Sequence, residues 1–184
     1  MSYRNILADQ SALGHNVSLG LDVDPFKIPD CKRGTKGLKK LIDSCYDFLV
    51  DIVIATGENV QSYKPNLAFF EQFGHEGMEM LESIVLLIKQ NFPNVLLIGD
   101  AKRGDIDNTN AAYMKALEMF HAFTIAPYLG GQANKPFFFD EDGALRDKLV
   151  FVLCQTSNKG AGEFQDLWTM DFNPAKIPTG IPAM

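Results

Sequence analysis

The chain has 184 residues, of which 46% are hydrophobic and 22% are charged, a balance typical of one soluble globular domain and unlike a disordered or fibrous protein. The formal net charge is −6 and basic residues are scattered among acidic ones, so we expect no nucleic-acid partner. The apolar runs are much shorter than the ~20 residues of a membrane span, and the first residues do not resemble a secretory signal, so we expect a cytoplasmic protein with no membrane partner.

Apolar runs of strand length alternate along the chain with segments of helical periodicity. The predicted strands are Val17–Asp22, Val60–Lys64, Val95–Asp100, Ala122–Ala126 and Leu149–Cys154. Between them, apolar residues recur every three or four positions within 38–52, 78–88 and 112–120, as on the buried face of a helix. This alternation favours an α/β fold in which crossover helices cover a parallel sheet.

The pattern changes after Phe164. The last twenty residues contain three prolines and show neither strand nor helix periodicity. We therefore predict a domain of about five βα units over 1–164 and an irregular tail over 165–184.

Charged residues stand where the first three predicted strands end. The carboxyl ends of parallel strands converge on one rim, where ligands bind, so we expect Asp22, Lys64, Asp100 and Lys102 to lie there. Asp100 and Lys102 are two positions apart on an extended segment and should form a hydrogen-bonded ion pair. Asp105 follows after a turn with a glycine. An ammonium group between carboxylates stays protonated, so this lysine would act as an acid and not as a nucleophile.

Such a cluster suits decarboxylation without a cofactor. A fixed ammonium group would stabilise a developing carbanion, and a substrate carboxylate held near Asp100 would be repelled until it left as carbon dioxide. Two unit charges ~4 Å apart at an effective dielectric constant of ~20 interact by ~4 kcal/mol, which is only part of a catalytic barrier. The alternative is a solvated structural set of ion pairs, which the positions at strand ends make less favoured.

Four segments, in order between about residues 17 and 164, resemble motifs that follow successive strands of orotidine 5'-monophosphate decarboxylases. They are Leu19–Pro25, Ser62–Glu71, Asp100–Ile106 and Gln155–Gly160. The resemblance implies a (β/α)₈ TIM-barrel type of fold, here incomplete, with strands six to eight absent from the sequence. It also implies a lyase that converts orotidine 5'-monophosphate to UMP and carbon dioxide in de novo pyrimidine biosynthesis, with no cofactor and no metal.

The same resemblance assigns roles within one subunit. Lys102 would deliver a proton to carbon six of the pyrimidine, and Asp100 would stress the leaving carboxylate while holding Lys102. Lys64 would complete the charge array, Asp22 would bind the ribose hydroxyls, and Ser157 would bind the pyrimidine.

Other residues are implied to act across a homodimer. The aspartate matching Asp105, with the neighbouring Ile106 and Thr109, enters the active site of the partner subunit in this family. Lys159 stands where relatives commonly carry proline, a departure that bears on the stiffness of the loop after the fifth strand.

A second departure concerns the phosphate. The family grips it with loops after strands seven and eight, including an arginine, and the sequence has no counterpart, so we expect a truncated or frameshifted product with impaired turnover. Two alternatives stay open. One is a magnesium-dependent sugar-phosphate decarboxylase or aldolase, with Asp22, Asp24 and Asp100 as ligands; the other is an inactive nucleotide-binding fragment.

Overall fold

The computed structural model describes residues 3–29, 37–169 and 181–182. The chain divides into two compact units, 1–151 and 152–184, which are described separately. In the described part of the chain, no helix is both long and apolar enough to cross a membrane.

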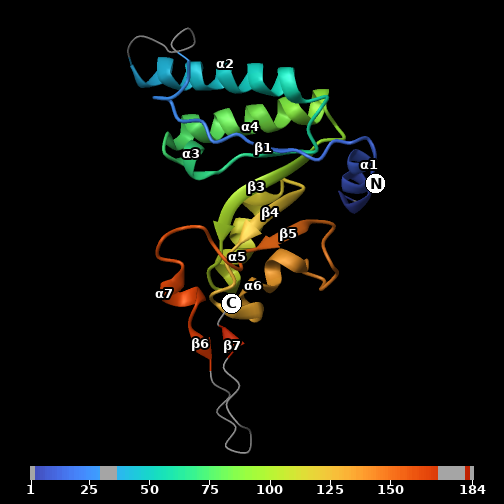
Figure 1. The fold of residues 1–184 in the computed structure, drawn as a ribbon, viewed down its shortest axis with the longest axis vertical. Helices are drawn as coiled ribbons and strands as arrows, with labels where there is room; N and C mark the ends of the chain where they lie inside the picture. The colour runs from blue at the N-terminus through green and yellow to red at the C-terminus, as the bar shows by residue number, and fades with distance from the viewer. Residues whose placement is uncertain (1–2, 30–36, 170–180, 183–184) are drawn as a thin grey trace, which may run out of the picture. The chain divides into compact units, whose positions relative to one another are not determined.

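The first unit is built on a five-stranded sheet (Figure 1). Its strands are β1 (Ser18–Gly20), β2 (Ser62–Lys64), β3 (Leu96–Arg103), β4 (Ala122–Ile125) and β5 (Leu149–Val152). They are ordered in space as in the sequence, and the pairs from β1 to β4 are parallel. The prediction of an incomplete (β/α)₈-type fold with about five βα units is therefore confirmed.

The helices of this unit are α1 (Tyr3–Ala12), α2 (Leu38–Thr56), α3 (Ala68–Glu71), α4 (Gly74–Asn91), α5 (Asp107–Leu117) and α6 (Gly130–Phe138). The three predicted helical segments correspond to α2, α4 and α5. The chain turns at 128–129 after β4 and then enters α6. This helix begins at Gly130 with a φ of 83° and is anchored by buried Ala133 and Phe137, although Pro136 lies inside it.

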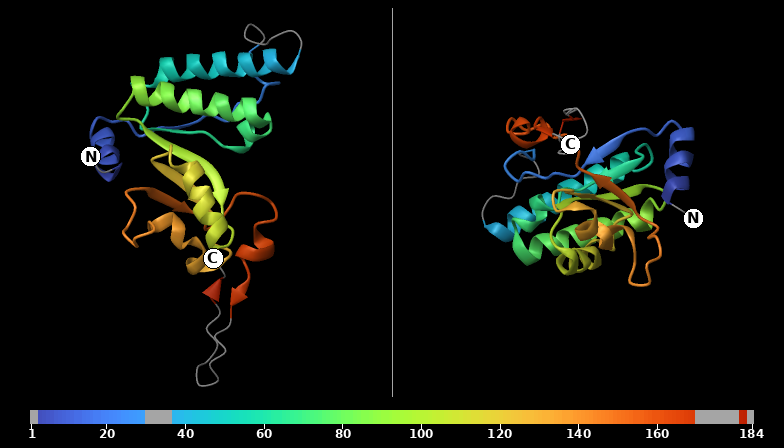
Figure 2. Two further views of the ribbon diagram at one scale, coloured as in Figure 1. Left: turned by 180° about the vertical axis from the view of Figure 1, so that it is seen from behind. Right: turned by 90° about the horizontal axis from the view of Figure 1, so that it is seen from below.

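The main core lies between the sheet and its helices. Figures 1 and 2 show α2 and α4 side by side along the sheet. Their inward-facing residues Leu49, Val53, Leu81 and Ile84 are at most 2% exposed. The run from Val95 to Asp100 is buried throughout, as expected for a central parallel strand covered on both faces. This packing fixes the strands whose ends carry the charged residues.

The second unit contains a short helix and one pair of two-residue strands. Helix α7 spans Gly162–Gln165, and β6 (Trp168–Thr169) pairs with β7 (Ile181–Pro182) in antiparallel fashion. The prediction that no strand would follow Phe164 is therefore wrong at these two positions. Two-residue strands are too short to show an alternating pattern in the sequence.

A substitution in α4 tests the close packing of α3 on α4. Gly77 is buried, and a Cβ atom there would overlap the carbonyl oxygen of Phe70 and lie 2.8 Å from Cβ of Phe73. Because backbone atoms cannot move aside easily, we expect Gly77→Ala to lower the free energy of unfolding by roughly 1–3 kcal/mol, measured by urea denaturation. Gly131→Ala is the matched control, since nothing lies within 4 Å of its added Cβ. Equal stability of the two variants would contradict this packing.

A second prediction concerns His121, whose Nδ1 accepts a 3.1 Å hydrogen bond from the Leu97 backbone N–H and whose ring stacks on Tyr3 at 4.6 Å. Burial, together with the charges of Lys89 and Lys148, lowers the pKa of His121 from 6.5 to about 4. The unfolded chain therefore takes up this proton first as pH falls. The stabilisation from neutral His121 is complete above pH ~6.5 and is lost as pH falls towards 4.

His121→Asn removes the titrating ring but keeps an acceptor for the Leu97 N–H. We expect the difference in free energy of unfolding between wild type and this variant to be constant above pH ~6.5. Between pH ~6.5 and 4, the wild type should lose stability relative to the variant as pH falls, which urea denaturation at several pH values would measure. Parallel pH dependence of both proteins throughout this range would show that His121 does not carry the effect.

Candidate active site

The carboxylate of Asp100 is the centre of a charged cluster contributed by three neighbouring strands. Its Oδ2 accepts a 3.0 Å hydrogen bond from Lys64 Nζ, and its Oδ1 accepts one of 2.5 Å from Lys102 Nζ and one of 2.9 Å from Thr124 Oγ1. The side chain of Asp100 is only 9% exposed. The structure thus brings together three of the four residues predicted to be catalytic.

The donors decide the charge of Asp100. Burial by itself would raise the pKa of this carboxyl, but the hydrogen bonds from Lys102, Lys64 and Thr124 outweigh burial and lower the pKa below its ordinary value. The side chains of Lys102 and Lys64 are 48% and 36% exposed, so both are accessible to solvent. A fixed anion therefore lies beneath two accessible cations.

The backbone of β3 is irregular at this point. Gly99 pairs with Phe123 and Arg103 pairs with Ile125, so β3 has two more residues than β4 between these pairs. Lys102 lies in this bulge with a φ of 47°, the left-handed region, and its N–H donates to Thr124 Oγ1 at 2.9 Å. The ion pair between Asp100 and Lys102 is present, but a bulge and not a regular extended segment positions it.

The chain leaves β3 close to the end of β4. The Ala126 N–H donates to Arg103 O at 2.7 Å, and a Cβ atom on Gly104 would lie 2.6 Å from Ala126 O, so only glycine fits there without a shift. Arg103 forms an ion pair with Glu71 and lies 5.0 Å from the centre of the Tyr113 ring. These contacts, which the sequence did not indicate, hold the segment that leads to Asp105.

Asp22, predicted to bind ribose, lies just after β1 and is exposed. Its Oδ1 accepts a 3.2 Å hydrogen bond from the backbone N–H of Asn66, which follows β2 and forms a parallel bridge with Asp100. Asn66 was not singled out from the sequence, although it lies in one of the four motifs. Through it, the end of β1 is connected to the strand that carries the charge cluster.

Asp105, Ile106 and Thr109 lie where the chain enters α5. Buried Asn110 clamps this turn, because its Oδ1 accepts from Asp105 N at 2.8 Å and its Nδ2 donates to Asp105 O at 2.6 Å and to Ala133 O at 2.8 Å. The carboxylate of Asp105 accepts from Ile106 N at 2.7 Å, and Ile106 is 58% exposed. Among the described residues, no ion pair joins Asp105 to Lys102, so the structure does not add Asp105 to the cluster of its own chain.

Ser157 belongs to the second unit, where it lies exposed on the loop between β5 and α7. Its neighbour Thr156 is fixed by Gln165, which accepts from Thr156 N at 2.8 Å and donates to Thr156 Oγ1 at 2.8 Å. The predicted pyrimidine contact of Ser157 stays a prediction.

The carboxylates named as alternative magnesium ligands do not form a ligand set. Within residues 3–29, 37–169 and 181–182, no group of three or more histidine, cysteine, aspartate or glutamate side chains is arranged to hold a metal ion. Asp24 instead accepts a 3.0 Å hydrogen bond from Phe26 N and forms a 3.1 Å ion pair with Lys27. The hydrogen bond from Phe26 and, to a lesser extent, the contact with Lys27 lower the pKa of Asp24.

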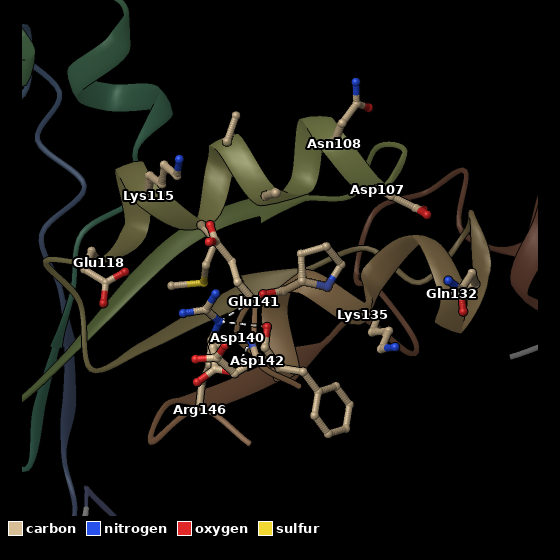
Figure 3. A pocket seen from close by; sticks show the side chains of 15 residues that line it. Asp107, Asn108, Lys115, Glu118, Gln132, Lys135, Asp140, Glu141, Asp142 and Arg146 are labelled. Atoms are coloured by element: carbon tan, nitrogen blue, oxygen red, sulfur yellow. Dashed lines mark hydrogen bonds between the residues drawn. The ribbon is translucent and has the colours of Figure 1, made fainter. Parts of the chain in front are cut away.

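A separate pocket of about 680 Å³ lies between α5, α6 and the loop 140–146 (Figure 3). Its walls carry both signs of charge, and Arg146 is held at its edge by Nε hydrogen bonds of 3.1 Å to Pro136 O and Phe139 O. None of the residues around Asp100 lines it. The chemistry suggested by the charge cluster therefore does not extend to this pocket.

A family model and individual curated relatives both assign this chain to the same family. Residues 15–174 match the model of the Orotidine 5'-phosphate decarboxylase / HUMPS family. Curated proteins named orotidine 5'-phosphate decarboxylase are 39% identical over 154 residues in Flavobacterium johnsoniae and 40% identical over 159 residues in Roseiflexus castenholzii. The matches cover 82% and 85% of this chain but 52% and 53% of those proteins, so the chain spans about half the length of these relatives.

Solved structures show a similar fold. The OMP decarboxylase of Leishmania donovani is 35% identical with a TM-score of 0.66, covering 91% of this chain and 59% of that one. The UMP synthase of the same organism is 34% identical with a TM-score of 0.69, covering 91% of this chain and 33% of that one. With the family model matching most of its length, the chain belongs to the Orotidine 5'-phosphate decarboxylase / HUMPS family.

Proposed function

We propose that this chain carries the catalytic charge array of an orotidine 5'-monophosphate decarboxylase, which forms UMP and carbon dioxide in de novo pyrimidine biosynthesis. The observation that carries the proposal is the buried Asp100 carboxylate held between the ammonium groups of Lys64 and Lys102. The names of the curated relatives support this substrate over the sugar phosphates of other family members.

The proposed reaction needs one bond to break and one to form. The bond between carbon six of the pyrimidine and its carboxylate breaks, carbon dioxide leaves, and the electron pair stays on carbon six. Lys102 then donates a proton from Nζ to that carbon, giving a C–H bond and a neutral amine that regains a proton from solvent. The reaction consumes no oxidant or reductant.

Asp100 serves this reaction in two ways. Its negative charge repels a substrate carboxylate placed beside it, a repulsion that ends when carbon dioxide leaves, and it fixes Lys102 where the carbanion forms. Lys64 holds the other carboxylate oxygen and adds a second positive charge to the site. In a partly desolvated site, two opposite unit charges interact by ~4 kcal/mol. Substrate positioning therefore has to supply the rest of the reduction in the activation barrier.

Binding groups extend the proposal away from the cluster. Asp22, whose carboxylate can accept two O–H donors, would bind the ribose hydroxyls, and Ser157 would bind the pyrimidine. Asp105, Ile106 and Thr109 would act in the site of a partner subunit. The exposed position of Ile106 and the absence of an ion pair between Asp105 and Lys102 among the described residues support a role outside the chain's own cluster.

The first test removes the proposed acid. We expect Lys102→Ala to lower kcat/KM by about 10²–10⁴-fold, the usual contribution of a general acid, measured as loss of the ultraviolet absorbance of orotidine 5'-monophosphate. Lys39→Ala is the matched control because Lys39 is exposed at the start of α2. We expect this control to keep wild-type activity.

Three results would contradict the proposal. One is equal activity of Lys102→Ala and Lys39→Ala. Another is a folded wild-type chain that binds UMP in calorimetry but causes no loss of absorbance, which would select a nucleotide-binding fragment. The third is activity abolished by a chelator and restored by Mg²⁺, which would select the metal-dependent alternative.

The second test concerns the proposed sharing of Asp105. Lys102→Ala and Asp105→Ala variants are each expected to be nearly inactive. When equal amounts are dissociated and reassociated, half of the dimers are mixed, and each has one site with both native residues, so about a quarter of wild-type activity should return. Mixtures that stay as inactive as their components would refute a shared site.

A further inference from the structure

Thr124 faces the charge cluster from β4. Phe123 and Ile125, its neighbours in the strand, are at most 1% exposed, and Phe123 packs against Phe137 of α6 at 5.7 Å between ring centres. Because successive side chains of a strand point to opposite faces, Thr124 points away from α6. Its hydroxyl is thereby directed to the face that carries Asp100.

The hydroxyl of Thr124 makes two hydrogen bonds of opposite sense, both 2.9 Å long. It accepts from the backbone N–H of Lys102, and it donates to Oδ1 of Asp100. A hydroxyl has one hydrogen and two lone pairs, so both bonds are satisfied at once. A single side chain therefore joins the backbone of one cluster residue to the carboxylate of the other.

The first of these bonds stands where the β ladder is interrupted. In the bulge between Gly99 and Arg103 the Lys102 N–H points to a side-chain oxygen of β4. The φ of 47° at Lys102 is unfavourable for a residue with a Cβ atom, and such a conformation persists only where its surroundings fix it. The Thr124 hydroxyl is one such fixing contact.

We propose that Thr124 is a positioning residue that fixes Lys102 against Asp100 by holding the bulged backbone of Lys102 and one oxygen of Asp100 together. The inference rests on the proposed decarboxylation, and Thr124 acts only through these two residues. Without the hydroxyl, Lys102 can leave the left-handed conformation and its ammonium group shifts away from the reacting carbon. Displacements of ~1 Å cost about 10²-fold in rate, whereas Asp22, the group proposed to bind the ribose, is unaffected.

Two substitutions separate the hydroxyl from the shape of the side chain. Thr124→Val keeps the branched shape without the hydroxyl, and Thr124→Ser keeps the hydroxyl. We expect Thr124→Val to lower kcat by about 10–100-fold with KM within about threefold of wild type, and Thr124→Ser to retain kcat within about threefold. A merely structural role would not produce this split between kcat and KM or this recovery by serine.

Hydrogen exchange provides a readout that does not depend on activity. In the wild type the amide of Lys102 should exchange slowly, and in Thr124→Val it should exchange at least about tenfold faster while the amide of Phe123 is unchanged. Thr124→Ser should keep the slow exchange. If the wild-type chain shows no decarboxylation, the proposed function fails, but these exchange rates still test whether Thr124 holds Lys102.

Three results would overturn the inference. The first is a Lys102 amide that exchanges equally in wild type and Thr124→Val. The second is an active wild-type chain in which Thr124→Val has an unchanged kcat or in which valine and serine lower kcat equally. The third applies if Thr124→Val does not fold, in which case hydrogen exchange of the wild type alone tests the inference. A wild-type Lys102 amide that exchanges as fast as an amide in an unstructured chain would contradict a hydrogen bond to Thr124.

Discussion

A negative charge that is nearly buried between two ammonium groups is the interaction on which the site depends. A carboxylate with 9% exposure is unfavourable unless its charge is compensated, and Asp100 is compensated by Lys64, Lys102 and Thr124. These donors come from β2, β3 and β4, so the cluster requires β3 to lie between the other two strands. The parallel strand order meets that requirement, and buried α2 and α4 hold the order in place.

The sequence predicted the parts of the fold that have long and regular patterns. Helices α2 and α4, of 19 and 18 residues, show clear apolar periodicity, and the buried run of β3 is almost continuous. Helix α3 has four residues, too few for any period, and α6 contains Pro136 and begins with two glycines, which oppose helix formation. Burial of Ala133 and Phe137 against the rest of the unit overrides that local preference.

The cluster itself was partly predictable, because strand ends converge, and this brings Lys64, Asp100 and Lys102 together. Its fine structure was not. A lysine gives no sequence signal for a left-handed φ, so the bulge was interpreted as regular strand. Thr124 lies in an apolar run, where a threonine indicates only β propensity. The clamp by Asn110 depends on a hydrogen bond to Ala133, which is distant in the sequence. Such interactions are tertiary and leave no local pattern.

The formal charges of the cluster bear on the proposed sharing of the site between two subunits. Lys64 and Lys102 outnumber Asp100, so the cluster has one net positive charge, which would attract the anionic substrate proposed above but would weaken the proposed repulsion of its carboxylate. A second carboxylate would restore that repulsion. Asp105 does not supply this carboxylate within its own chain. Asn110 fixes the turn that carries Asp105, and the carboxylate of Asp105 accepts a hydrogen bond from Ile106 N. In the proposed dimer, Asp105 of a second copy would supply this second carboxylate.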